Sequence, residues 1–118
     1  MAVLSSMRVR FEDVRELAFG SITTSYAAVG SAFSQPLRML KIVNATNTPM
    51  YISYDGVNDK DWIAANSQFI YDYGTNKADQ ASVLEQTSGE RVYVKYDDDF
   101  GAPTSGKVVV ITIYASSV

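Results

Sequence analysis

The feature that most constrains the fold is the way turn-forming residues repeatedly break the chain into short apolar runs. Past residue 22, runs rich in Val, Ile, Tyr and Phe alternate with clusters of Gly, Pro, Asn and Asp, which is typical of strands joined by tight connections. The runs cover residues 25–33, 37–44, 50–54, 62–63, 68–73, 91–96 and 107–114. This spacing predicts about seven or eight short strands, the pattern of an all-β sandwich or jelly roll.

Individual runs differ in what they predict. Residues 68–73 alternate, which places Phe69, Tyr71 and Tyr73 on one face of a strand. Residues 37–44 and 107–114 are apolar on both faces, so we expect central strands that are covered on both sides. Between residues 74 and 89 the chain is polar and irregular, and favours only one helical turn around residues 80–84.

The first 20 residues form a different kind of segment, the N-terminal arm, ahead of a single β-sandwich domain over residues 21–118. Within residues 8–19, Phe11, Val14 and Leu17 recur at helical spacing between charged residues, which predicts a short helix. Such a short helix is marginal in water, so its apolar stripe needs a partner, either the protein's own core or a neighbouring subunit. We expect the neighbour, and these three residues are candidate subunit-interface residues.

The amino-acid composition excludes most kinds of catalytic site. The 118 residues include no cysteine and no histidine, which excludes thiol nucleophiles, Ser-His-Asp triads, imidazole bases and most zinc sites. Only carboxylates, Lys, Tyr and Ser remain as chemical groups. We therefore expect a protein that is not an enzyme, with no cofactor, no metal and no small-molecule substrate. The hydrophobic content of 47% is that of a folded domain.

Charge and hydropathy limit the classes of partner that the protein can bind. The net charge of −3 divides into about +2 over residues 1–41 and −5 over residues 42–118. An acidic body disfavours nucleic-acid binding, which needs a positive surface. No apolar stretch approaches the ~18 residues that cross a bilayer, and the first six residues are too short for a signal-peptide core. We therefore expect that the protein binds neither nucleic acid nor a membrane. We also expect that it is made in the cytoplasm.

Two acidic clusters invite a cation-binding interpretation. Residues 55–61 crowd Asp and Asn side chains but depart from the EF-hand pattern, because Val57 stands at the third ligand position and no Glu stands at the twelfth. We interpret this segment as a turn that caps its own backbone. Residues 97–99 are three consecutive aspartates, which we interpret as a solvated charged loop with no acid–base role. Asn44 fits the N-glycosylation pattern, but the match carries no weight without a secretory signal.

The tyrosines are the remaining candidates for recognition. Their rings combine a large apolar face with a polar tip, which suits subunit interfaces and also stacking on carbohydrate. On the interface interpretation, Tyr71 and Tyr73 are further candidate subunit-interface residues. The alternative is that the tyrosines occupy half-buried strand positions, which would explain them equally well. The tyrosines considered are Tyr51, Tyr54, Tyr71, Tyr73, Tyr93 and Tyr96.

Strand and turn patterns stand out along residues 40–115, in the stretches LKIVNATNTPMYISYDGVNDKDWIAANSQFIYDYGTNK, RVYVKY, APTSG and VVVITIYA, with LAFGSITTSYAAV upstream. Through these stretches the chain resembles a recurrent type of small virion protein of tailed bacteriophages. The resemblance covers about four-fifths of the chain and includes no catalytic residue.

The resemblance implies a structural component of a phage virion, made in the host cytoplasm and incorporated into the particle. Proteins of this type resemble neck, collar and tail-assembly components in some cases and capsid decoration proteins in others. Both kinds work as oligomers, so the implied partners are further copies of this chain and other virion proteins. We expect a head–tail junction or tail protein. A capsid decoration or cement protein is the alternative, and a receptor- or carbohydrate-binding β-sandwich that uses the tyrosines and Trp62 is a third.

Overall fold

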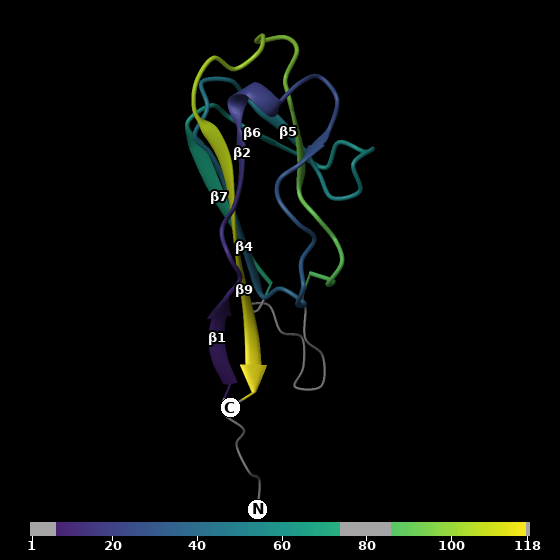
Figure 1. Ribbon diagram of the computed structural model, residues 1–118, viewed down its shortest axis with the longest axis vertical. Helices are drawn as coiled ribbons and strands as arrows, with labels where there is room; N and C mark the ends of the chain where they lie inside the picture. The colour runs from purple at the N-terminus through teal and green to yellow at the C-terminus, as the bar shows by residue number, and fades with distance from the viewer. Residues whose placement is uncertain (1–6, 74–85, 118) are drawn as a thin grey trace, which may run out of the picture.

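Two antiparallel sheets pack face to face in the computed structural model, which describes residues 7–73 and 86–117 (Figure 1). The expected helical turn around residues 80–84 lies outside these residues. The five-stranded sheet has the order β1-β9-β4-β7, and β2 also pairs with β9. Its strands are β1 Met7–Phe11, β2 Arg15–Ala18, β4 Met39–Asn44, β7 Ser67–Asp72 and β9 Lys107–Ser117. The all-β sandwich prediction is confirmed.

The second sheet has four short strands in the order β3-β8-β5-β6. These strands are β3 Ala27–Ala28, β5 Met50–Ser53, β6 Asp61–Ile63 and β8 Tyr93–Tyr96, and one 3₁₀ turn, η1 Phe19–Ser21, follows β2. Because β9 is much longer than its neighbours, its far end pairs only with β1 and projects from the body as a two-stranded ribbon (Figure 1).

The core lies between the sheets and is built from β-branched and aliphatic side chains. The inward positions of β4 and β9, including Leu40, Ile42, Val108 and Val110, are fully buried, and Ile52 and Val94 face them from the other sheet. The remaining core residues are Ile22, Val29, Phe33, Leu37, Met50, Ile63 and Val92. The alternation of buried and half-buried residues along β4 follows the pleat of a strand with one face in the core.

The helix predicted within residues 8–19 is wrong. This segment forms β1 and β2, which both pair antiparallel with β9. Val9 and Phe11 also alternate with arginines, so the same residues fit a strand, and β9 supplies backbone partners that a short isolated helix lacks. The arm beyond residue 6 is therefore part of the sandwich sheet. The expectation that residues 37–44 and 107–114 are covered on both faces is also wrong, because their outward side chains stay half-buried or exposed.

Candidate assembly surface and other candidate sites

The outer face of the five-stranded sheet carries mostly apolar side chains, with Glu16, Lys41, Gln68 and Asp72 among them, and has no second layer over it in the described part of the chain. Strand register places Phe11, Ile113 and Met39 in one row across β1, β9 and β4. A second row holds Ile111 and Ile70 on either side of Lys41, and a third holds Val109 and Val43. Phe11 and Ile70 are 65% and 54% exposed. We call the five-stranded sheet sheet A, and we call this surface the sheet A face. Its apolar residues are Val9, Phe11, Met39, Val43, Ile70, Val109, Ile111 and Ile113.

The three candidate residues of the N-terminal arm lie in three different environments. Phe11 belongs to the sheet A face, beside Val9, which is 69% exposed on the ribbon. Val14 is exposed in the connection between β1 and β2. Leu17 points inward and packs against the core, opposite Val108. The structure therefore brings Phe11 to an uncovered surface and assigns Leu17 to the interior.

Tyr71 and Tyr73 lie on the inner side of the same sheet. Both pack against the core, in a line that begins at Phe69, and the Tyr71 and Tyr73 rings are stacked with centroids 6.2 Å apart. The Tyr73 hydroxyl donates to Gln86 Oε1 at 2.8 Å. Burial, together with the charge of Glu90, raises the pKa of Tyr73 to about 12, so its phenol stays neutral. Both rings are half-buried, Tyr71 within β7 and Tyr73 directly after it, and neither is part of the sheet A face.

The tyrosines of the four-stranded sheet divide in the same way. Tyr54 and Tyr96 pack against the core. Tyr51 lies on the outer side, directly between Trp62 on β6 and Lys95 on β8. Tyr26 comes just before β3 and reaches the same lysine, whose Nζ is 4.7 Å from its ring centroid. Reading the sequence missed Tyr26, because its position depends on the pairing of β3 with β8.

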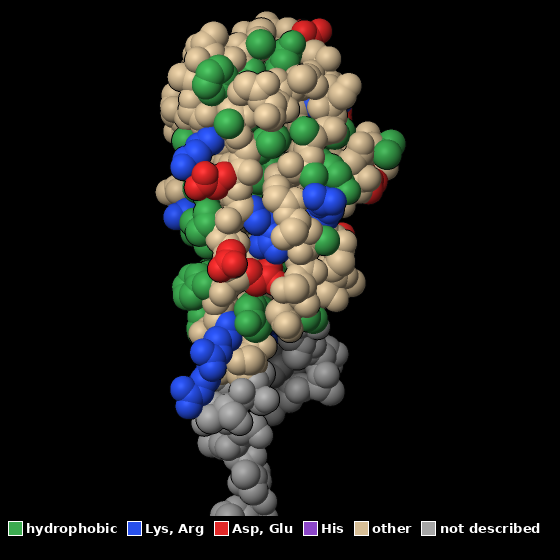
Figure 2. Space-filling model, viewed as in Figure 1, with side chains coloured by type: hydrophobic (Ala, Val, Ile, Leu, Met, Phe, Trp, Pro, Cys, Tyr) green, Lys and Arg blue, Asp and Glu red, His purple; other side chains and the backbone are tan. Residues whose placement is uncertain are grey.

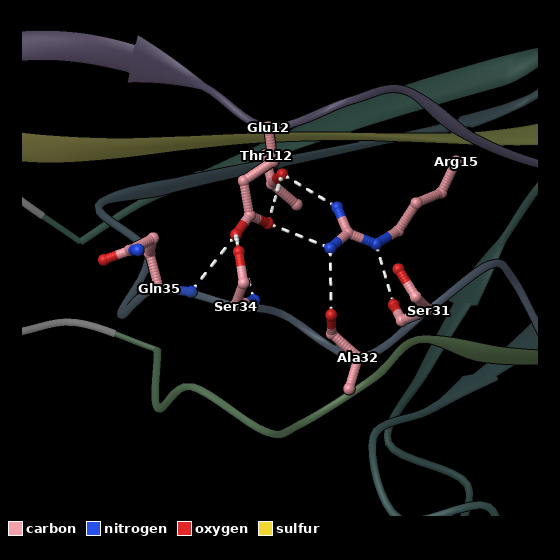
Figure 3. Close-up of polar contacts among 7 residues, drawn as sticks. All are labelled: Glu12, Arg15, Ser31, Ala32, Ser34, Gln35 and Thr112. Carbon is pink, nitrogen blue, oxygen red and sulfur yellow. Dashed lines mark hydrogen bonds and ion pairs between the residues drawn. The ribbon is translucent and has the colours of Figure 1, made fainter.

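A buried ion pair joins the β1–β2 edge of the five-stranded sheet to residues 31–35, the segment that follows β3. Glu12 and Arg15 stand at the connection of β1 with β2, and their side chains are only 6% and 7% exposed. The guanidinium donates to Glu12 Oε1 at 3.0 Å, to Thr112 Oγ1 at 3.0 Å and to the carbonyls of Ser31 and Ala32 at 2.8 and 3.1 Å (Figure 3). The other Glu12 oxygen accepts from the backbone N–H groups of Ser34 and Gln35.

The pair lines a pocket of about 330 Å³ at the open edge of the sandwich, but its geometry indicates a structural clasp. Each guanidinium nitrogen of Arg15 donates within the protein. The carboxylate of Glu12 accepts on both oxygens. The stem of Arg15 rests on Gly30, where a Cβ would come within 2.7 Å of it, and its guanidinium lies 5.3 Å from the Phe33 ring centroid. Sequence patterns missed this clasp because a charged pair in a polar segment is normally solvated.

The turn residues that carry the resemblance meet at one end of the sandwich. Asn44 is fully buried, and its amide donates to the carbonyls of Thr48 and Ala64 at 2.9 and 3.2 Å. Its side-chain oxygen accepts from the backbone and hydroxyl of Thr46. Asn44 is therefore a structural residue, and a buried amide held by these bonds is inaccessible to glycosylation in the folded chain. Nearby, Asn47 and Thr104 bond each other across two loops.

The acidic segment at residues 55–61 has the self-capping geometry that the sequence suggested. Asp55 Oδ1 accepts from the backbone N–H groups of Val57 and Asn58, both at 2.9 Å, and Oδ2 accepts from the Asn58 amide. These bonds hold the pKa of Asp55 well below its ordinary value. The described residues contain no group of three or more acidic side chains placed to hold a metal ion.

The three aspartates at residues 97–99 are not solvated alike, so that part of the interpretation is wrong. Asp97 is only 6% exposed and accepts from the Trp62 indole N–H at 3.0 Å, while Asp98 and Asp99 are exposed. Its other oxygen accepts from the backbone N–H of Asp99. Asp97 differs from Asp98 and Asp99 because its side chain is buried and binds the loop to β6.

We predict a loss of stability in acid. Burial alone raises the pKa of Glu12, but hydrogen bonds from Ser34, Thr112 and Arg15 outweigh it, so the pKa lies below the ordinary 4.5. A carboxyl whose pKa is lower in the folded than in the unfolded chain stabilises the fold above the unfolded value, and this contribution is lost as the pH falls through the folded value. Urea unfolding should therefore show constant stability at neutral pH and a decline below about pH 4.5.

The Glu12→Gln variant is the matched comparison for this decline. It cannot titrate at residue 12, so its stability should fall less steeply with pH than that of the wild type. Equal stability of the wild-type chain at pH 7 and pH 3, or an identical slope in the variant, would contradict the assignment.

No protein-family model matches the chain, and no curated protein matches it significantly. Among the described residues, no helix is long and apolar enough to cross a membrane.

Proposed function

We propose that the protein is a structural component of a bacteriophage particle, which assembles with copies of itself and with neighbouring virion proteins through the sheet A face. Two arguments support this. The strand and turn patterns resemble small virion proteins of tailed phages, and the uncovered apolar face supplies the surface that such a role needs. The proposal includes no catalytic step.

The observation that carries the proposal is the exposed β1–β9 ribbon. Isolated two-stranded ribbons are at best marginally stable in water, yet this one exposes Val9, and Phe11 is exposed at its base, where β4 joins β9. In Figure 2, basic side chains extend where the ribbon leaves the body. Exposed apolar residues that lie together on one face mark sites of protein association, so a neighbouring subunit would complete the ribbon.

The face also has a shape that a partner can fill. A groove of about 370 Å³ lies where the ribbon joins the body, lined by Val9, Met39 and Ile113 together with the charged residues Arg38 and Asp72. Buried apolar anchors in such pockets dominate the affinity of protein interfaces. Polar residues such as Lys41 and Gln68 lie in the same rows as the apolar ones, as at interfaces that must also stay soluble before assembly.

Within the particle, we propose a position at the head–tail junction or in the tail. A place on the capsid surface, as a decoration or cement protein, is the alternative. The two differ in symmetry, because neck and tail rings are sixfold or twelvefold and cement proteins occupy threefold or quasi-threefold positions. A cryo-electron microscopy reconstruction of the intact particle distinguishes them directly.

We predict that Phe11→Asp prevents assembly without unfolding the chain. A charge in the middle of an apolar contact should weaken self-association by about 30-fold or more. Because Phe11 is largely exposed, the free energy of unfolding should change by no more than ~0.5 kcal/mol. Sedimentation equilibrium measures the association, and the amount of variant protein in purified particles measures incorporation.

Val57→Asp is the control for this experiment. Val57 is 76% exposed but lies in the turn after β5, outside the sheet A face. This variant should associate and be incorporated like the wild type. Normal incorporation of Phe11→Asp into particles, with wild-type self-association, would refute the assembly role of this face.

A further inference from the structure

A second exposed surface lies on the other side of the molecule, on the outer face of the four-stranded sheet. Trp62, Tyr51 and Lys95 are direct cross-strand neighbours on β6, β5 and β8, and Tyr26 completes the row at the edge. Adjacent strands are about 4.8 Å apart, so the row extends about 15 Å across the sheet. We call these four residues the aromatic row.

The rings of the aromatic row are held in place, with Trp62 exposed and Tyr26 and Tyr51 half-buried. Trp62 is 43% exposed, although its indole N–H is fixed on the buried Asp97. Lys95 Nζ lies between two rings, 4.7 Å from the Tyr26 centroid and 5.7 Å from the Tyr51 centroid. Cation–π contacts of this kind orient the rings. A surface whose side chains are already ordered loses less entropy when it binds a ligand.

Polar groups accompany the rings at the Tyr26 end of the row. Asp59 accepts a hydrogen bond from the Tyr26 hydroxyl and forms an ion pair with Lys95 at 3.2 Å. The Asp59 side chain is still 49% exposed and that of Lys95 27%. The charges of Asp59 and Lys95 offset each other within this pair, so this end offers a carboxylate acceptor and an ammonium donor. Such a surface suits a neutral ligand that is both apolar and rich in hydroxyl groups.

We propose that the aromatic row binds a neutral oligosaccharide. The C–H faces of pyranose rings stack on exposed Trp and Tyr rings, which are apolar with a polar edge. The hydroxyl groups around each sugar ring would bond to Asp59 and Lys95. Because the row crosses the strands and has aromatic rings at both ends, it fits an extended chain of sugars along its length. This surface is separate from the sheet A face, so a particle-bound copy would keep it free.

The single tryptophan of the chain makes the test direct, since Trp62 lies in the proposed site. The intact protein is titrated with maltohexaose, cellohexaose, xylohexaose, mannohexaose and chitohexaose while its intrinsic fluorescence is recorded, and calorimetry measures the heat. At least one of these probes should shift the Trp62 emission in a saturable way. Tyr26→Ala and Tyr51→Ala should each weaken that binding by about tenfold, with the indole kept as reporter.

Phe19→Ala is the control, because it removes a partly exposed ring from η1, away from the aromatic row. It should bind as the wild type does. Equal melting temperatures of the tyrosine variants and the wild type confirm that their loss of affinity is local. The proposal is overturned if none of the five probes binds at millimolar concentration, or if binding survives both tyrosine substitutions. It is also overturned if the tyrosine variants lose only incorporation into particles, which would make this face a protein contact.

Discussion

Arg15→Met should lower the free energy of unfolding by about 3–5 kcal/mol, the range observed when one member of a buried ion pair is removed. The substitution keeps much of the apolar stem but leaves the Glu12 carboxylate, whose side chain is 6% exposed, without its cation. It also leaves the carbonyls of Ser31 and Ala32 without the donors that Arg15 supplies. Urea unfolding at pH 7, monitored by circular dichroism, measures the loss.

Two further variants show whether the loss comes from the clasp. Arg8→Met removes an equivalent charge from an exposed position on β1 and should cost at most ~0.5 kcal/mol. The double variant Glu12→Gln/Arg15→Met removes the stranded charge, so it should recover part of the stability lost in Arg15→Met. If Arg15→Met behaves like Arg8→Met, the clasp does not hold residues 31–35 to the five-stranded sheet.

Gly106→Ala should be the most damaging glycine substitution in the described chain. Gly106 has φ +91°, a conformation that costs other residues about 1–2 kcal/mol. In addition, a Cβ at this position would meet the carbonyl oxygen of Ala45 at 1.9 Å, and a backbone atom cannot move aside as a flexible side chain can. The Ala45 N–H donates to the backbone carbonyl of Lys107 at 2.9 Å, so the chain after β4 and the chain before β9 are held together at this point.

Gly101→Ala separates the two contributions. Gly101 has a similar φ of +83°, but nothing lies within 4 Å of its Cβ position. Its substitution should cost only the conformational strain, about 1–2 kcal/mol. Gly106→Ala should exceed it by about 2 kcal/mol or more in chemical unfolding. Equal losses for the two variants would mean that the loops separate easily and that the close approach contributes little.

The sequence predicted the sandwich because the main strands carry local signals. The alternation in β7 and the apolar runs of β4 and β9 stand in the chain itself, so no tertiary information was needed. The prediction for the N-terminal segment was wrong because two patterns overlap there. Phe11, Val14 and Leu17 fit a helical period, whereas the alternation of Val9 and Phe11 fits a strand. Pairing with β9, about 100 residues away in the chain, decided between the two.

The candidate sites were harder to predict because they depend on register. Phe11 was found as an exposed apolar residue, but its neighbours Met39 and Ile113 come from strands distant in the sequence. Tyr26 was missed for the same reason. Asp97 shows the limit most clearly, because nothing in three consecutive aspartates distinguishes the one that is buried on Trp62 from the two that are exposed.

The position of β9 has a consequence for how the chain folds. β9 pairs with β1, β2 and β4, yet it follows all the other described strands in the sequence. During synthesis, the partners of β1 and β2 therefore do not exist until residues 107–117 have left the ribosome. Closing such long loops makes folding slow. The apolar strands of the five-stranded sheet stay open to other chains meanwhile, so newly made protein is most prone to aggregate before its last strand is inserted.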